Sequence, residues 1–300
     1  MKNITILGCG SWGGTLGKLL SEKNNRITMW HRNSDIIENL IKTRKHYIVK
    51  DLTFSNKILF KSDISKSIWN ADIIVLALPT QVLRERLKAN KKYFQKHQII
   101  VNVSKGIEID SLMTVSEIVK DVLGNNYTNL VTLSGPSHAE EVLKKNPTAI
   151  VAASEDIEIA KVIQKLFATE MLRTYLNKDL RGVELGGAMK NVIAIAAGMC
   201  DGIGYGDNSK AALMTRGMAE IVKLGNKMGA NPKTFRGLSG YGDLIVTCLS
   251  RHSRNRSLGQ SIGEGKALKN VISDMNMVAE GVSTSKSVHQ LAEKYNIEMP

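Results

Sequence analysis

The sequence predicts an α/β fold, with a doubly wound sheet over residues 1–178 followed by an all-α domain over residues 179–300. Two observations support this division. In the first part of the chain, strand-like apolar runs alternate with helix-like segments, which is typical of a parallel sheet covered by helices. After about residue 178 the strand-like runs fade and long helical segments dominate. At 300 residues the chain is long enough for two domains.

The strands are predicted from short apolar runs that end at turn residues. Residues 71–78 (ADIIVLAL) are apolar at almost every position, as expected of a strand buried on both faces, and the run ends at Pro79. The other predicted strands cover residues 3–7, 26–30, 99–103, 130–134, 148–153 and 172–176.

The helices are predicted between and after these strands. The first follows a glycine-rich turn through Leu16 and Leu20, and Thr80 is the expected N-cap of the next, which runs to Lys91. A Gly135-Pro136 turn opens another. The remaining predicted helices cover residues 156–167, 179–199, 209–229, 257–264 and 284–295.

The composition is that of an ordinary globular protein, with 43% hydrophobic and 23% charged residues. The longest strongly apolar runs are too short to span a membrane, and the chain opens on a strand pattern rather than a signal peptide. Three scattered cysteines match neither a disulfide framework nor a metal site, so we expect no metal and a cytoplasmic location. A net charge of +13 is compatible with nucleic acid, an anionic membrane surface or small phosphorylated ligands.

A glycine motif lies between the first strand and the first helix. Gly8, Gly10 and Gly13 of GCGSWG have the spacing of a dinucleotide-binding turn. Glycines there permit a tight turn and let backbone N–H groups approach a pyrophosphate at the positive end of a helix. The motif alone is a weak signal, and its place between a strand and a helix makes it a strong one.

The end of the second strand bears on the choice of cofactor. His31-Arg32-Asn33 follows it, where an NAD-specific fold usually carries an acidic residue for the ribose 2′-hydroxyl. Arg32 suits a 2′-phosphate instead, because a guanidinium binds phosphate oxygens in pairs. The sequence therefore predicts that NADP(H) is preferred and NAD(H) is possible, unless Arg32 is only an exposed loop residue.

Further candidate site residues follow the ends of two predicted strands. Lys105 follows the strand at 99–103, and Ser137 follows the strand at 130–134. Strand ends of this kind meet at the ligand crevice of a doubly wound sheet. Both residues are therefore expected at the site, although either could be ordinary loop polarity.

Lys190 lies within residues 184–207, in an apolar run that reads as a buried helix. A buried ammonium loses its hydration unless partners replace the water. One interpretation is a lysine whose stem follows the core until the charge reaches water. The other is a catalytic lysine that faces a cleft.

Two loops in the second half of the chain carry polar and charged candidate site residues. Asp243 ends a glycine-rich turn, where it could cap a helix or belong to a site. Ser253, Arg254 and Asn255 bring a hydroxyl, a guanidinium and an amide together, which suits one small phosphate. Nucleic acid is the alternative, but the patch is short and lacks interleaved aromatic residues.

Taken together, these segments resemble the soluble NAD(P)-dependent glycerol-3-phosphate dehydrogenases. The motifs that carry the resemblance span nearly the whole chain, in the family's order: GCGSWG, SKGIE, SGPS, ELGGAMKNVIAIAAGMCDGIGYGDN, GYGDLIVTC, SRNRSLG and AEGVSTSKSV. The resemblance implies a Rossmann-type domain followed by an α-helical substrate domain. It also implies reversible reduction of dihydroxyacetone phosphate to sn-glycerol 3-phosphate, a precursor of phospholipids.

The resemblance also assigns residues. It implies Lys190 as the catalytic residue. Cofactor contacts would come from Gly8, Gly10, Ser11, Trp12, Gly13, His31, Arg32, Lys105, Ala139, Arg254 and Glu280. Substrate contacts would come from Lys105, Gly135, Ser137, Lys190, Asp243, Ser253, Arg254 and Asn255.

The sequence departs from the family's pattern in three places. His138 replaces the usual aromatic residue, and the segment after Tyr47 lacks the usual Leu-Pro, so no cofactor contact is assigned to Tyr47. Relatives continue beyond the position of Pro300, so either the helical domain packs less well or the sequence is incomplete.

The expected chemistry centres on Lys190. Hydride arriving at a carbonyl carbon creates an alkoxide, and a lysine ammonium supplies both a proton and a positive charge. Lys105 and Arg254 would lower the pKa of Lys190, and Asp243 would raise it. The expected partner is a small phosphorylated substrate, without nucleic acid or a membrane span, and a homodimer is possible.

Two rival functions stay open at this stage. One is a related two-domain reductase of another small keto compound, which would not need the phosphate-binding cluster. The other is a non-enzymatic nucleotide- or nucleic-acid-binding protein, which would not need a buried lysine facing the cofactor crevice.

Overall fold

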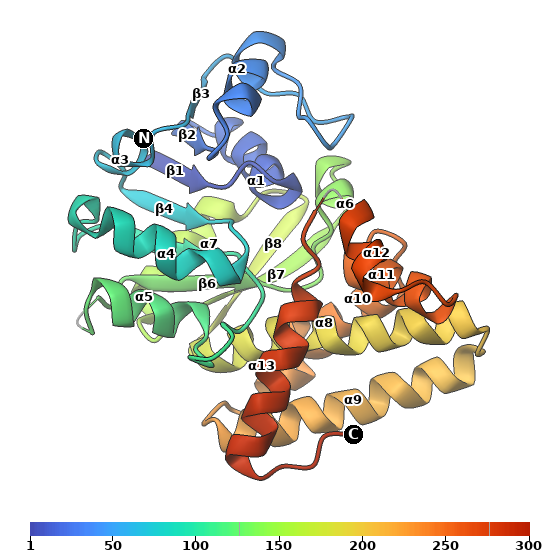
Figure 1. The fold of residues 1–300 in the computed structure, drawn as a ribbon. Coiled ribbons are helices and arrows are strands. Elements are labelled where there is room, and N and C mark those ends of the chain that lie inside the picture. Colours follow the sequence, from blue (N-terminus) through green and yellow to red (C-terminus); the bar gives the residue numbers. More distant parts are fainter. Residues whose placement is uncertain (126, 276) are drawn as a thin grey trace.

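The computed structural model describes residues 1–125, 127–275 and 277–300. Its centre is a single eight-stranded sheet in the order β3-β2-β1-β4-β5-β6-β7-β8, with helices on both faces and a group of long helices at one end (Figure 1). The strands are β1 (Asn3–Leu7), β2 (Arg26–Trp30), β3 (Ile58–Lys61), β4 (Ile73–Leu76), β5 (Ile99–Asn102), β6 (Leu130–Ser134), β7 (Thr148–Ala153) and β8 (Leu172–Asn177).

The helices of the sheet-containing part are α1 (Ser11–Ser21), α2 (Ser34–Thr43), α3 (Ile64–Ile68), α4 (Thr80–Asn90), α5 (Val115–Leu123), α6 (Ala139–Leu143) and α7 (Ile157–Phe167). The later helices are α8 (Leu180–Ile203), α9 (Asp207–Lys227), α10 (Asp243–Leu249), α11 (Arg254–Gly263), α12 (Leu268–Asp274) and α13 (Glu280–Tyr295). Three short turns, η1 (Lys91–Tyr93), η2 (Thr234–Arg236) and the π-helical η3 (Leu238–Gly242), complete the described elements.

The sheet has a core on each face. In β4, Ile73 and Val75 point into one core, and Ile74 and Leu76 point into the other. All four side chains are at most 1% exposed, which is why this strand reads as apolar at every position. A third core, containing Leu185, Met189 and Phe235, holds the long helices together.

The prediction of a parallel sheet is wrong at one place, because β7 pairs antiparallel with β6. A parallel neighbour needs a crossover connection, usually through a helix of normal length. Between β6 and β7 the chain forms only the five-residue α6, which is too short for such a crossover. The chain therefore runs back directly beside β6. The longer α7 then returns the chain across the sheet, and β8 pairs parallel with β7.

The predicted cap at Thr80 is also wrong. Pro79 occupies the N-cap position of α4, and Thr80 is the first helical residue. The Thr80 N–H donates instead to Glu280 Oε1 at 2.8 Å. An acidic side chain from α13 therefore takes the place at the start of α4 that a local cap would have filled.

The sequence analysis did not identify α2, β3, α3, α5 or α12. Two local signals could have found α2 and α5. Asn33 caps α2 by accepting from the N–H groups of Asp35 and Ile36. Thr114 and Glu117 form a capping box at the start of α5. The helices α11 and α13 also begin three to four residues earlier than predicted, at Arg254 and Glu280.

By length and composition, α8 is the one helix among the described residues that could cross a membrane. In this fold 67% of its most apolar stretch is buried, against α9, α10, α11 and α13. Glycines allow α11 to pack almost backbone to backbone on it: a side chain at Gly198 would overlap the Arg256 carbonyl, and one at Gly259 would overlap the Ile195 carbonyl. This close crossing brings the start of α11 to the site described next.

Candidate active site

A cleft of about 750 Å³ opens where β1, β4 and β5 end, between the sheet and the long helices. Ligands of doubly wound sheets bind at this edge. Most of the residues expected at a site line it: Gly8, Gly10, Ser11, Trp12, Gly13, His31, Arg32, Lys105, Ser137, Ala139, Lys190, Ser253, Arg254, Asn255 and Glu280. Gly135 and Asp243 do not line the cleft but lie directly behind Lys105, whose Nζ donates to both.

The glycine-rich turn has the geometry for close approach of a pyrophosphate. Gly8 has φ +117°, and a side chain there would overlap the Ala77 carbonyl oxygen. Open space lies where a Gly10 side chain would be. No side-chain cap and no acidic residue occupy the first turn of α1, so its N–H groups can bind an anion. These residues fit a dinucleotide cofactor.

The far end of the cleft is aromatic and basic. His31 packs edge-on against Tyr47, with ring centroids 5.7 Å apart, and Tyr47 stacks on His46 at 4.8 Å. Arg32 follows His31, and both Arg32 and Arg86 line the cleft. Tyr47, to which the sequence analysis assigned no contact, therefore belongs to the cleft wall beside His31.

Lys190 lies at the centre of a buried ion cluster. Its side chain is 7% exposed, and its Nζ donates to Asp243 Oδ1 at 2.5 Å and to Thr247 Oγ1 at 2.6 Å. The other carboxylate oxygen of Asp243 accepts from Lys105 Nζ at 2.6 Å. One carboxylate thus holds two ammonium groups, and Lys190 lines the cleft instead of extending to bulk water.

Burial and these charges set the protonation of the cluster. Loss of hydration lowers the pKa of Lys190 to about 8, Asp243 opposes this shift, and Lys105 adds to it. The two lysines keep the pKa of Asp243 below its ordinary value despite burial. A lysine with this pKa can release its proton close to neutral pH.

The interpretation of Asp243 as an N-cap is wrong. Gly242 occupies the N-cap position of α10, and Asp243 is the first helical residue. The preceding segment, expected to be a flexible turn, forms the π-helical η3. This element delivers Asp243 inward, where its side chain is 2% exposed.

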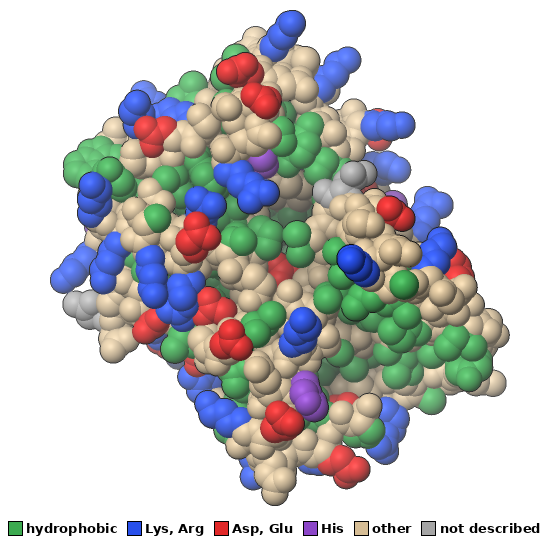
Figure 2. Space-filling model, viewed as in Figure 1, with side chains coloured by type: hydrophobic (Ala, Val, Ile, Leu, Met, Phe, Trp, Pro, Cys, Tyr) green, Lys and Arg blue, Asp and Glu red, His purple; other side chains and the backbone are tan. Residues whose placement is uncertain are grey.

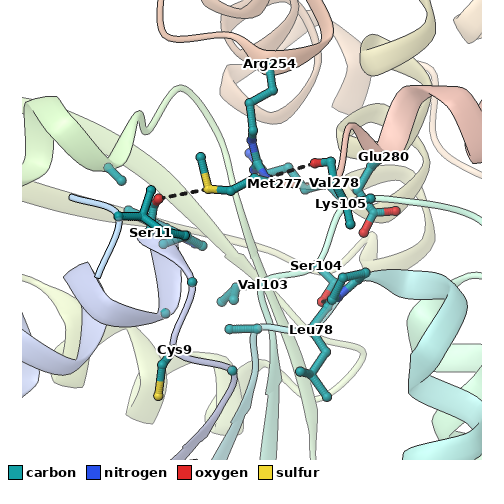
Figure 3. A pocket seen from close by; sticks show the side chains of 18 of the residues that line it. Cys9, Ser11, Leu78, Val103, Ser104, Lys105, Arg254, Met277, Val278 and Glu280 are labelled. Carbon is teal, nitrogen blue, oxygen red and sulfur yellow. Dashed lines mark hydrogen bonds between the residues drawn. The ribbon is translucent and has the colours of Figure 1, made fainter. Parts of the chain in front are cut away.

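A segment before α13 borders the opposite side of the cleft. Arg254 Nη1 donates to the Val278 carbonyl at 2.9 Å, and Ser11 Oγ donates to Met277 Sδ at 3.2 Å (Figure 3). Glu280 follows, with Oε2 buried and unpartnered among the described residues, and burial raises its pKa to about 7. Glu280 thus lines the cleft while its Oε1 accepts from the start of α4.

Comparison with known proteins identifies the family. Residues 3–160 match the model described as NAD-dependent glycerol-3-phosphate dehydrogenase N-terminus, and residues 179–300 match the corresponding C-terminus. The chain belongs to the NAD-dependent glycerol-3-phosphate dehydrogenase family.

Its relatives are similar over the whole chain. A glycerol-3-phosphate dehydrogenase [NAD(P)+] of Bacillus velezensis is 47% identical over 100% of this chain and 88% of its own length. One of Staphylococcus aureus (strain JH9) is 48% identical over 100% of this chain and 91% of its own. The crystal structure of the Coxiella burnetii glycerol-3-phosphate dehydrogenase is 32% identical, with a TM-score of 0.94 over 100% of this chain and 91% of that one.

The structure of this family member adds residues that the sequence analysis missed. Thr247 lies one helical turn after Asp243 and bonds the same lysine, so its spacing of four residues was the available signal. Asn191 Nδ2 donates to the Lys105 carbonyl at 3.1 Å. Val278, Met277 and His252 line the cleft without any motif to mark them.

His138, where the sequence departs from the family pattern, lies near the cluster of Lys190, Lys105 and Asp243. Its ring lies 6.0 Å from that of His252, and both line the cleft. Burial, and then the charge of Lys190, lowers the pKa of His138. A neutral imidazole therefore borders the lysine in this dehydrogenase.

Proposed function

We propose that the protein is a glycerol-3-phosphate dehydrogenase that interconverts dihydroxyacetone phosphate and sn-glycerol 3-phosphate and supplies the latter for phospholipid synthesis. Residues 1–178 are the coenzyme domain and residues 179–300 the substrate domain. NADP(H) is the preferred cofactor, and NAD(H) is also accepted. The observation that carries the proposal is the Lys190 ammonium, buried against Asp243 at the wall of a cleft that begins at a dinucleotide turn.

When bound, a reduced nicotinamide supplies hydride to the carbonyl carbon of the substrate. Lys190 then transfers its Nζ proton to the carbonyl oxygen, so that the developing alkoxide becomes a hydroxyl. Asp243 and Thr247 hold the Nζ group in place, and Lys105 adds a second positive charge. In the reverse direction, neutral Lys190 takes the proton from the alcohol.

The substrate phosphate is assigned to the start of α11. Ser253 Oγ accepts from the Arg256 N–H at 3.2 Å, so its own proton is available to a phosphate oxygen. Asn255 Oδ1 accepts from the Gly281 N–H at 3.0 Å, which leaves the Asn255 amide hydrogens as donors. The Arg254 guanidinium lies between these two residues in sequence.

The face of the molecule seen in Figure 2 favours a small anionic ligand over a nucleic acid. Lys and Arg side chains are scattered over the visible face, with acidic residues among them, rather than gathered into one stripe (Figure 2). A cytoplasmic location and a homodimer are also part of the proposal. Size-exclusion chromatography with light scattering tests the homodimer.

The direct test is a spectrophotometric assay. Purified protein should oxidise NADPH when dihydroxyacetone phosphate is added, and should reduce NADP+ with sn-glycerol 3-phosphate. Absence of turnover with both coenzymes in both directions would refute the proposed activity.

Arg254→Ala should reduce kcat/KM for dihydroxyacetone phosphate by about ten- to hundredfold, because a charge-assisted contact is worth about 1.5–3 kcal/mol. Unphosphorylated dihydroxyacetone never makes this contact, so its poor turnover should hardly change. The ratio of the two kcat/KM values is the measurement, and it cancels general damage to the fold. An unchanged ratio would remove Arg254 from phosphate recognition.

Arg32→Ala should weaken NADPH binding by about tenfold or more and leave NADH nearly unaffected, because only NADPH carries the 2′-phosphate. Fluorescence titration of the two coenzymes measures this difference. Arg236→Ala, at an exposed arginine of η2, is the control and should change neither affinity. Equal losses for both coenzymes in Arg32→Ala would contradict the assignment.

A further inference from the structure

Glu184 is a buried carboxyl group of α8 that the mechanism above does not use. It is 6% exposed. Its Oε1 accepts from Asn102 Nδ2 at 3.1 Å and from Thr132 Oγ1 at 2.9 Å. Ser116 donates its backbone N–H to Oε1 at 3.0 Å and its hydroxyl to Oε2 at 2.6 Å.

These partners all belong to the sheet-containing part of the chain, on β5, α5 and β6. Within the described residues, Glu184 forms no ion pair with a Lys or Arg. Burial of a carboxyl group without a cation is costly, and burial raises the pKa of Glu184. An apolar side chain would be the ordinary choice on so apolar a helix, so this position calls for a specific explanation.

The two strands that hold Glu184 end at the active site. Asn102 is the last residue of β5, and its Oδ1 accepts from the Ser104 N–H at 2.8 Å, directly before Lys105. Thr132 lies two residues before Ser134 on β6, and Gly135 supplies the carbonyl that accepts from Lys105 Nζ. The network around Glu184 is thus continuous with both strand exits.

The face of α8 that carries Glu184 also passes these exits. Glu184, Gly187 and Asn191 share one face of the helix, at spacings of three and four residues. A side chain at Gly187 would lie 2.8 Å from Ser134 Oγ. Asn191, which directly follows Lys190 in the sequence, donates to the Lys105 carbonyl. Movement of α8 along this face would therefore displace Lys190 relative to Lys105.

We infer that Glu184 is a positioning residue, which fixes α8 against the ends of β5 and β6 and so sets the separation between Lys190 and Lys105. It acts through these two lysines and does not touch the substrate. This inference rests on the proposed function. It adds that the hydrogen bonds of Glu184 keep Lys190, the proton donor, aligned with the coenzyme side of the cleft.

Two substitutions test the inference. Glu184→Leu keeps the approximate volume and removes all four hydrogen bonds. Turnover should fall by about 100-fold, the usual effect of a misplacement of about 1 Å at a reacting group. The KM for NADPH should change much less than kcat, because the glycine-rich turn lies outside the network. The primary deuterium isotope effect on kcat should rise as the hydride step becomes slower.

Glu184→Gln separates hydrogen bonding from burial. Its carbonyl oxygen can accept the three bonds of Oε1, and its amide can donate to the Ser116 hydroxyl. Turnover should therefore return close to that of the natural protein. If Glu184→Leu does not fold, Thr132→Val removes one hydroxyl, which donates to Glu184 and accepts from Asn102, and a smaller loss of kcat with little change in the KM for NADPH is expected.

Gln98→Leu is the matched control. Gln98 is fully buried, and its amide donates to the carbonyls of Ile68 at 2.8 Å and Ala71 at 3.0 Å, at the opposite end of β5. This variant should lose stability but keep its kcat. Equal kcat values in Glu184→Leu and Gln98→Leu would overturn the inference, and so would a Glu184→Gln variant as slow as Glu184→Leu. Failure of the natural protein to turn over dihydroxyacetone phosphate would instead refute the proposed function.

Discussion

Lys190→Met should fold normally and lose turnover by about 10²–10⁴-fold, the usual contribution of general acid catalysis. Methionine matches the length and apolar stem of lysine, so the packing of α8 is kept. Asp243 would still be paired with Lys105, so no carboxylate is left alone in the interior. The loss should therefore appear in kcat, while NADPH binding measured by fluorescence stays near normal.

The pH dependence gives this prediction a second measurement. The pKa of Lys190 lies at about 8, so reduction should slow as the pH rises through 8, where the ammonium loses its proton. Oxidation should accelerate over the same interval, because it needs the neutral amine. Both limbs should disappear in Lys190→Met.

Lys210→Met provides the control for removal of a partly buried lysine. Lys210 pairs with Asp201 in the helical part of the chain and does not line the cleft. Its removal should cost stability without a loss of turnover. Near-normal kcat in a folded Lys190→Met variant would show that Lys190 is not the proton donor.

Asp243→Asn should lower the free energy of unfolding by about 3–5 kcal/mol, because breaking a buried ion pair leaves uncompensated charge in the interior. Here one substitution leaves two ammonium groups, those of Lys105 and Lys190, without a carboxylate. The pKa of Lys190 should fall below about 8, since Asp243 is the main group that raises it. Reduction should then decline at a lower pH than in the natural protein.

Urea denaturation and the pH profile of kcat measure the two effects. Asp121→Asn is the control, because Asp121 pairs with Arg84 at the surface and its side chain is 46% exposed. A surface pair of this kind contributes about 0–1 kcal/mol. If Asp243→Asn were no less stable than Asp121→Asn, the central role of Asp243 in the lysine cluster would be contradicted.

Much of this protein could be predicted from local sequence patterns. The buried strand at 73–76 and the long apolar helix around Lys190 follow from which residues avoid water, and that preference is expressed within a few neighbouring positions. The glycine motif is equally local, because its turn and its helix start lie within six residues. The resemblance to the family, with its order of motifs, supplied the expected substrate.

Other features depended on distances that no local pattern contains. The direction of β7 was decided by a connection too short for a crossover, and the start of α4 by a carboxylate 200 residues away in Glu280. The local sequence around Asp243 fits either a helix cap or a site residue, and the fold turns the side chain inward between two lysines that lie 53 and 138 residues from it along the chain. Charge placement of this kind is set by which chain segments the packed core brings together. For that reason only the tertiary structure could add Thr247 and Glu184 to the Lys190 and Asp243 pair that the resemblance to the family had already suggested.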